Sequence, residues 1–176
     1  MLLDGSRQVL ATSCQVAGRW PVAQDSTAVH AELAGELVRL VGGRLLDPLE
    51  ILLDGAGTGP LRERVRADAE MWAAQSPGSA DEPAVALVAR LLAALYPGDE
   101  PFDPPESWWR TPLGRVTARR VGHPARHHVS FATAGAMLGI TRQGVHDLVG
   151  RGKLRRHPDG GIDSESVRER LCALAA

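Results

Sequence analysis

The amino-acid sequence predicts a mainly helical protein in two parts of opposite charge. Apolar residues recur at helical spacing in both parts. Four prolines lie between Pro97 and Pro105, and proline fixes φ and removes amide donors, which is typical of a linker. Residues 1–106 carry 8 Arg against 16 acidic residues, whereas residues 107–176 carry 11 Arg and 1 Lys against 5 acidic residues. The expected units are an acidic helical domain at 1–97, the linker at 98–110 and a basic domain at 111–176.

The first two helices are expected between residues 25 and 55. Helical spacing begins after residue 25, and Gly42-Gly43 is expected to stop the first helix. The stretch DPLEILLDG places Asp47 as N-cap, Pro48 at the first helical position and Gly55 as terminator. We expect this second helix to be short and largely buried. The apolar positions of the first helix are Val29, Leu33, Leu37 and Leu40.

Two longer helices are expected before the linker. Pro60 opens one of them and Pro77 ends it. The other, DEPAVALVARLLAALYPG, is apolar almost all round except at Arg90, which is typical of the central helix of a bundle. We therefore expect residues 25–97 to form a set of four helices. One face of the first of these two longer helices carries Leu61, Val65, Ala69 and Trp72.

Paired tryptophans, Trp108 and Trp109, stand at the end of the linker in a chain that is only 4% aromatic. We expect them to anchor the linker onto one of the two domains. A partner-binding role is the alternative, because tryptophans flanked by prolines and Arg110 are similar to an interaction hot spot.

The basic half is expected to begin with a helix capped by Thr111 and opened by Pro112. This helix extends to Val121, with its inner face formed by apolar residues. Its arginines are expected to point outward, and they are Arg115, Arg119 and Arg120.

Two short helices follow. Ser130 is suited to cap the first, FATAGAMLG, and Gly139 supplies the positive φ that ends it. Ile140 fills the turn, and Thr141 caps the second helix, RQGVHDLVGRG. Two short helices joined by a three- to four-residue turn that contains glycine form a helix-turn-helix.

The stretch VSFATAGAMLGITRQGVHDLVGRGKL resembles the helix-turn-helix of the MerR-like and excisionase-type DNA-binding families. A small-residue helix, an LG turn, a Ser or Thr cap and an RGKL exit recur there. The next stretch, RRHPDGGIDSESVRERL, is similar to the hairpin wing and following helix of those families. The resemblance spans Val129 to Leu171 and implies a winged helix-turn-helix domain. Gly135 and Gly144 depart from the pattern, each costing roughly 0.5–1 kcal/mol against Ala.

The resemblance implies a DNA-binding surface on the second helix, its exit and the wing. Arg142 is suited to a bidentate contact with guanine and Gln143 with adenine. Gly144 is expected to let the helix approach a base or phosphate closely. Phosphate or minor-groove contacts are expected at the exit and wing. The expected DNA-binding residues are Ser130, Thr141, Arg142, Gln143, Gly144, His146, Arg151, Lys153, Arg155, Arg156 and His157.

We expect no cofactor, no metal and no enzymatic activity. The GAGTGP loop follows a helix rather than a strand, which favours a flexible connector over a dinucleotide site. HPARHH, His123 to His128, offers metal ligands, but no second ligand cluster accompanies it in the sequence. Cys14 and Cys172 lie at opposite ends, in no pattern typical of zinc or disulfides. No nucleophile stands on a recognisable elbow.

Composition favours a folded, soluble protein, because 44% hydrophobic content is enough for a core. The start of the chain lacks a basic n-region followed by an apolar run, so we expect no export and no membrane span. With DNA as the expected partner, the expected location is the cytoplasm, in association with the nucleoid.

Three functions fit these patterns. The first is a bacterial sequence-specific DNA-binding protein, a transcriptional regulator that dimerises or recruits a partner through its acidic half. The second is an excisionase-like or plasmid-maintenance accessory protein that bends DNA. The third is an antitoxin or adaptor that binds a protein partner through the acidic domain, with the helix-turn-helix acting as an interaction hairpin.

Overall fold

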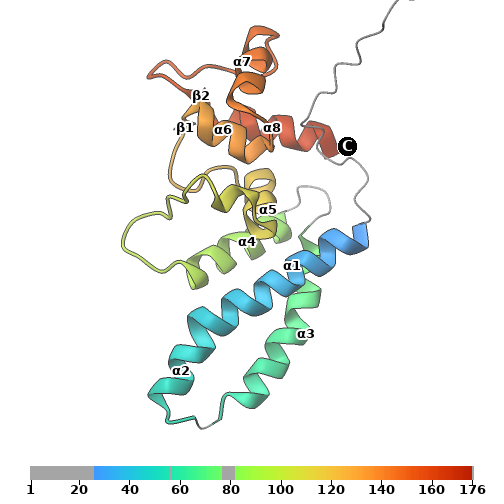
Figure 1. The fold of residues 1–176 in the computed structure, drawn as a ribbon, viewed down its shortest axis with the longest axis vertical. Coiled ribbons are helices and arrows are strands. Elements are labelled where there is room, and N and C mark those ends of the chain that lie inside the picture. The colour runs from blue at the N-terminus through green and yellow to red at the C-terminus, as the bar shows by residue number, and fades with distance from the viewer. Residues whose placement is uncertain (1–25, 56, 77–81, 176) are drawn as a thin grey trace, which may run out of the picture.

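The computed structural model describes residues 26–55, 57–76 and 82–175 (Figure 1). The chain is mainly helical, with one small antiparallel sheet of two strands, β1 (His128–Val129) and β2 (Ile162–Asp163). The helical elements are α1 (Ser26–Val41), the π-helical segment η1 (Gly42–Leu46), α2 (Asp47–Leu52), α3 (Gly59–Gln75), α4 (Glu82–Leu95), the 3₁₀ segment η2 (Trp108–Arg110), α5 (Pro112–Arg120), α6 (Phe131–Leu138), α7 (Arg142–Gly150) and α8 (Ser164–Ala175). Figure 1 shows α7 at one end of the long axis and α2 at the other.

The first hydrophobic core lies between α1, α3, α4 and the first half of α5. It is built from the positions that helical spacing placed on inner faces, such as Leu33, Leu37 and Val88. The α5 residues Leu113 and Val116 complete it. The expected helices are therefore confirmed at α1, α3 and α4. Their core also includes α5, which follows the proline-rich segment in the sequence.

The second hydrophobic core lies between α5, α6, α7, α8 and the sheet. Its fully buried centre includes Met137 of α6, Val145 of α7, Ile162 of β2 and Val167 of α8. Ala118 of α5 packs into it as well. The one helix α5 thus belongs to both cores.

The start of α5 is held from both sides. Thr111 caps it as expected, because its hydroxyl accepts a hydrogen bond from the Gly114 amide at 3.1 Å. The Leu113 amide donates to the buried carboxylate of Glu36 on α1 at 2.6 Å. A Cβ on Gly114 would lie 2.2 Å from the Trp108 carbonyl oxygen, so only glycine permits this approach of η2 to α5.

The expected outward orientation of the α5 arginines is wrong for Arg120. This residue is 3% exposed, and its Nε donates to the Ser76 carbonyl after α3 at 2.8 Å. Arg119 is half-buried, and this burial lowers the pKa of its guanidinium. The reason is that the two cores cover opposite faces of α5, so little of the helix surface is exposed to solvent.

The path from α1 to α2 differs from the prediction. Gly42-Gly43 does not stop the helical path, which continues through η1 directly into α2. Asp47 is consequently inside the helix, and its carboxylate accepts from Arg62 at 2.8 Å rather than capping. The expectation that α2 is largely buried is also wrong. None of its residues is buried, and Ile51 and Leu52 are 77% and 79% exposed.

The proline-rich segment is docked through aromatic side chains. Tyr96 and Phe102 stack with ring centroids 3.9 Å apart, and the Trp108 indole donates to the Tyr96 hydroxyl at 2.7 Å. Trp109 is completely buried in the second core. This packing agrees with the anchoring interpretation, and it contradicts a partner-binding role for Trp109, because a buried ring offers no surface to a partner.

Several sequence features fall outside the described residues. These are the RQVLATSCQV stretch, Cys14 and the proline at 77 that was expected to end α3. Within the described ranges, no helix combines the length and the apolar character needed to cross a membrane.

His123 lies at the junction of the linker and the second core. Its side chain is 1% exposed, and its ring centroid is 5.1 Å from that of Trp109. Burial lowers the pKa of His123 below the ordinary histidine value, although the Asp103 carboxylate nearby acts in the opposite direction. The folded protein therefore favours the neutral ring.

We predict that stability falls as the pH drops below about 6.5, because the unfolded chain then binds a proton at His123 more readily than the folded chain. In His123→Asn, the side-chain oxygen replaces Nδ1 as acceptor for the Ala125 amide. This variant should lose less free energy of unfolding between about pH 7.5 and about pH 5.5, measured by urea denaturation.

The control is His127→Asn, at an exposed position next to this junction. The pKa of Asp103 is lowered by Arg126, so the stability that this carboxylate contributes is lost only at more acidic pH. An equal pH-dependent loss in the wild type and both variants would contradict the assignment to His123.

Candidate nucleic-acid interface

The helices α6 and α7 have the caps that the sequence predicts. The Ser130 hydroxyl accepts from the Thr133 amide at 2.9 Å, and Gly139 ends α6 at a φ of 67°. The Thr141 hydroxyl accepts from the Gly144 amide at 3.1 Å and opens α7. The turn between the helices is therefore three residues long, and Val145 buries α7 against α6.

Two glycines explain how tightly this turn packs. A Cβ on Gly135 would lie 2.9 Å from the Ile140 carbonyl oxygen, so the end of the turn lies directly against α6. A Cβ on Gly144 would meet the Ile140 side chain at an ordinary contact distance of 3.4 Å. The bare side of Gly144 thus faces Ile140, which corrects the expectation that it serves a close approach to DNA.

The first turn of α7 and the loop after it present polar side chains to solvent. Arg142 and Gln143 are exposed at the start of the helix. Arg151 and Lys153 are exposed at its exit, and within the described chain neither they nor Arg142 form an ion pair. Arg156 is also exposed, with its guanidinium 5.5 Å from the centre of the Phe131 ring.

Other predicted site residues are engaged within the fold. Arg155 donates to Asp163 at 3.0 Å and to Glu169 at 2.7 Å, and these carboxylates raise the pKa of its guanidinium. His146 stacks on Phe131 with ring centroids 4.1 Å apart. The hydroxyls of the two cap residues are used by α6 and α7. The predicted site thus divides into exposed cations and residues that hold the structure.

Most arginines on several other elements differ from those of α7 and its exit because they form ion pairs. Those on α3, α5, α8 and the loop before β1 are mostly neutralised by a carboxylate of the same chain. The arginines paired in this way are Arg62, Arg64, Arg66, Arg115, Arg126 and Arg168, and Arg155 in the loop after α7 is paired as well. Within the described chain, unpaired basic side chains gather at α7 and its exit, and exposed arginines without an ion pair also occur elsewhere, at Arg39, Arg90 and Arg110.

The loop from 155 to 163 returns the chain to the sheet. The expected hairpin reduces to a single bridge between Arg156 and Ile162, because the main pairing of β2 is with β1. Asp163 then caps α8, accepting from the Glu165 amide at 3.0 Å. A Cβ on Gly161 would lie 2.4 Å from the Val129 carbonyl oxygen, so glycine permits the loop to lie against β1.

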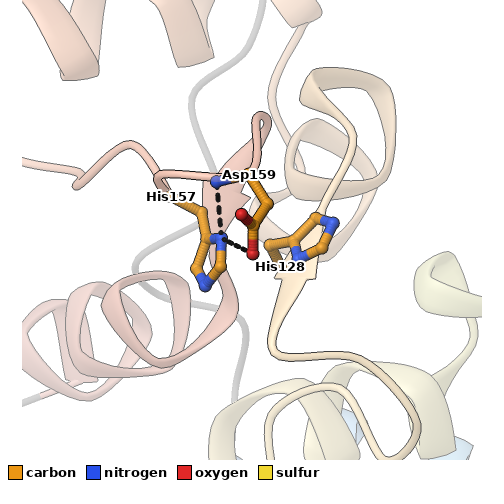
Figure 2. A group of neighbouring side chains, drawn as sticks. All are labelled: His128, His157 and Asp159. Carbon is orange, nitrogen blue, oxygen red and sulfur yellow. Dashed lines mark hydrogen bonds and ion pairs between the residues drawn. The ribbon is translucent and has the colours of Figure 1, made fainter.

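This contact brings together three groups that sequence reasoning did not connect. Figure 2 shows His128 of β1 beside His157 and Asp159 of the 155–163 loop. One potential ligand atom from each residue lies within 4.8 Å of the others. In the sequence, His128 belongs to the HPARHH stretch, which has no evident second group of ligands. The HPD triplet at 157–159 supplies the second group of ligands. The pairing of β1 with β2 brings it next to His128.

No protein-family model, no curated protein and no solved structure matches this chain. Any functional assignment therefore depends on the geometry and charge of α6, α7 and the 155–163 loop.

The glycine geometry predicts opposite effects at two positions. Gly144→Ala should raise the free energy of unfolding by roughly 0.5–1 kcal/mol, because alanine is the better helix former and its methyl group fits against Ile140. Gly135→Ala should lower it, because its methyl group meets a backbone oxygen. Urea denaturation of both variants measures this. A destabilised Gly144→Ala or an unaffected Gly135→Ala would refute the packing explanation.

Proposed function

We propose that this chain is a bacterial sequence-specific DNA-binding protein, a transcriptional regulator, that inserts α7 into the major groove. The observation that carries the proposal is the first turn of α7. This turn opens at a capped terminus and presents exposed Arg142 and Gln143, and α7 lies at one end of the molecule (Figure 1).

The chemistry of these two side chains supports direct reading of bases. In a docked helix-turn-helix, the N-terminal residues of the second helix contact base edges, while the first helix crosses the backbone. Arginine forms two hydrogen bonds to guanine, and glutamine forms two to adenine. In the free protein the Gln143 amide donates to Asp147 at 3.2 Å, an exposed contact that a base edge can replace.

The surrounding charge supports binding to the phosphate backbone. Arg151, Lys153 and Arg156 are exposed and follow α7 directly in the chain. Cations without a carboxylate partner are free to replace the counterions of DNA, which is the main source of affinity for the backbone. Arg155 is left out of this set, because Asp163 and Glu169 already neutralise it.

The likeness to the MerR-like and excisionase-type families belongs to this proposal. The caps, the three-residue turn and the bridge at Arg156 support a winged helix-turn-helix. An excisionase-like accessory protein would use the same surface, and it would differ in having many weak sites and in bending DNA. Work on DNA would place the protein at the nucleoid.

The exposed apolar surface of α2 supports a dimer. This surface, called the α2 tip, lies at the end of the molecule opposite α7 (Figure 1). Contiguous exposed apolar side chains of this kind mark interaction sites in soluble proteins. Its members are Leu45, Leu49, Ile51, Leu52, Leu53 and Leu61, each at least 36% exposed.

The occupant proposed for the α2 tip is a second copy of the chain. The carboxylates at its rim, Asp47 and Glu50, share Arg62 of the same chain as their ion-pair partner, which reduces the negative charge that two identical surfaces bring together. A two-fold axis that is parallel to the long axis of the molecule and passes beside the α2 tip would also bring both α7 helices to the same side, as two half-sites of a palindrome require.

We predict that Arg142→Ala combined with Gln143→Ala abolishes sequence preference, with a loss of roughly 1–3 kcal/mol for each base contact. Selection of bound fragments from a genomic library, followed by anisotropy titration, measures this. Arg64→Ala is the control, because Arg64 is exposed but paired with Asp68 on α3. Lys153→Ala should instead weaken binding to all sequences and lower the salt dependence by about one ion.

Enrichment of the same fragments by the wild type and the double variant would refute reading by α7. No binding of the wild type to any fragment at low salt would refute the function itself.

We also predict that Ile51→Asp combined with Leu52→Asp converts a dimer to a monomer. Both side chains are more than three-quarters exposed, so the core is not disturbed. Sedimentation equilibrium measures the mass, and Leu174→Asp on α8, an exposed leucine outside the tip, is the control. A monomeric wild type, or a stoichiometric partner protein released by the double variant, would favour the adaptor function instead.

A further inference from the structure

The cluster of His128, His157 and Asp159 has the composition of a metal site. Two imidazoles and one carboxylate come from two separate segments, β1 and the 155–163 loop (Figure 2). Imidazole suits zinc, copper and nickel, whereas magnesium and calcium prefer all-oxygen surroundings. We propose that these three residues bind a divalent transition-metal ion of the zinc class, a function separate from DNA binding.

The distances are close to those that such an ion imposes. Nitrogen and oxygen ligands lie about 2.0–2.2 Å from zinc, so two ligands of one ion are at most about 4.4 Å apart. The three candidate atoms lie within 4.8 Å of one another. His128 and Asp159 are exposed and His157 is partly exposed, so small side-chain rotations close this difference.

The backbone under the cluster is fixed before any ion arrives. The His157 amide donates to the Gly161 carbonyl at 3.3 Å, and the Gly160 amide donates to the His157 carbonyl at 3.0 Å. His128 is paired with Asp163 in the sheet, and Gly161 lies against β1. Only side-chain freedom is therefore lost on binding, which keeps the entropic cost low.

The side chains already lie next to one another. The rings of His128 and His157 are stacked with centroids 4.6 Å apart, so both rings rotate before their in-plane lone pairs converge on one ion. Nδ1 of His157 lies 3.2 Å from the Asp159 amide nitrogen, from which it accepts, and 3.6 Å from the Asp159 carboxylate. Its lone pair is thus directed to the side of the ring where the carboxylate lies, and an ion there would replace one weak hydrogen bond.

A bound ion would have a definite effect on the fold. With three protein ligands, the remaining coordination position is open to water. The ion would also join the 155–163 loop to β1, which are linked by the sheet pairing and the contact at Gly161. Since the ion binds the folded arrangement and not the separated segments, it would raise the stability of the protein.

Titration of the full chain with Co²⁺, followed by its visible absorption, and then competition with Zn²⁺ tests the site. We expect one ion per chain and a higher thermal midpoint with Zn²⁺. His128→Ala, His157→Ala and Asp159→Asn should each weaken binding roughly tenfold or more and remove the thermal shift. The matched controls are His127→Ala and His146→Ala, which remove histidines of the same half outside the cluster.

Circular dichroism of each variant establishes that it is folded. Absence of binding by the wild type would overturn the proposal. Binding that survives all three cluster substitutions would overturn it as well, because the ion would then be held by other residues. Neither result bears on DNA binding, which is measured without metal.

Discussion

The attachment of α5 to α1 is the constraint on which the arrangement of the molecule depends. A buried carboxylate is costly unless hydrogen bonds satisfy it, and Glu36 is satisfied by the Leu113 amide at the start of α5. The positive end of the helix dipole strengthens this contact. Through it, a helix that follows the proline-rich segment in sequence becomes part of the core of the segment before it.

The two cores consequently share one rigid element. Val116 faces the first core and Ala118 the second, while Gly114 lets η2 lie directly on the helix. The aromatic contacts of Tyr96 and Trp108 fix the proline-rich segment over this junction. The segment therefore stabilises the junction between the two halves. The orientation of α7 relative to α1 is set by the packing of both cores against α5.

This rigidity separates the proposed activities in space. The α2 tip and α7 lie at opposite ends of the molecule, so self-association and contact with DNA do not compete for surface (Figure 1). The cluster of His128, His157 and Asp159 lies between β1 and the loop that carries Arg156. A metal ion there would tie the proposed wing to the sheet beneath it. The charge division seen in the sequence thus corresponds to the proposed separation of DNA binding and self-association along one axis.

Local chemistry in the sequence determined the caps of α6, α7 and α8. Ser130, Thr141 and Asp163 cap the helices that they precede, because a short side-chain oxygen bonds the nearest free amides wherever the chain turns helical. Gly139 ends α6 for an equally local reason, since glycine accepts a positive φ.

Tertiary structure alone decided which surfaces are covered. The spacing in DPLEILLDG has the pattern of a buried helix, yet no described element lies over Ile51. Arg120 looks like a surface residue by type, yet two cores enclose it. The two histidines and Asp159 are separated by a helix-turn-helix length of chain, and a two-residue strand pairing brings them together. Burial and long-range contact depend on which segments meet, and that is a property of the whole chain.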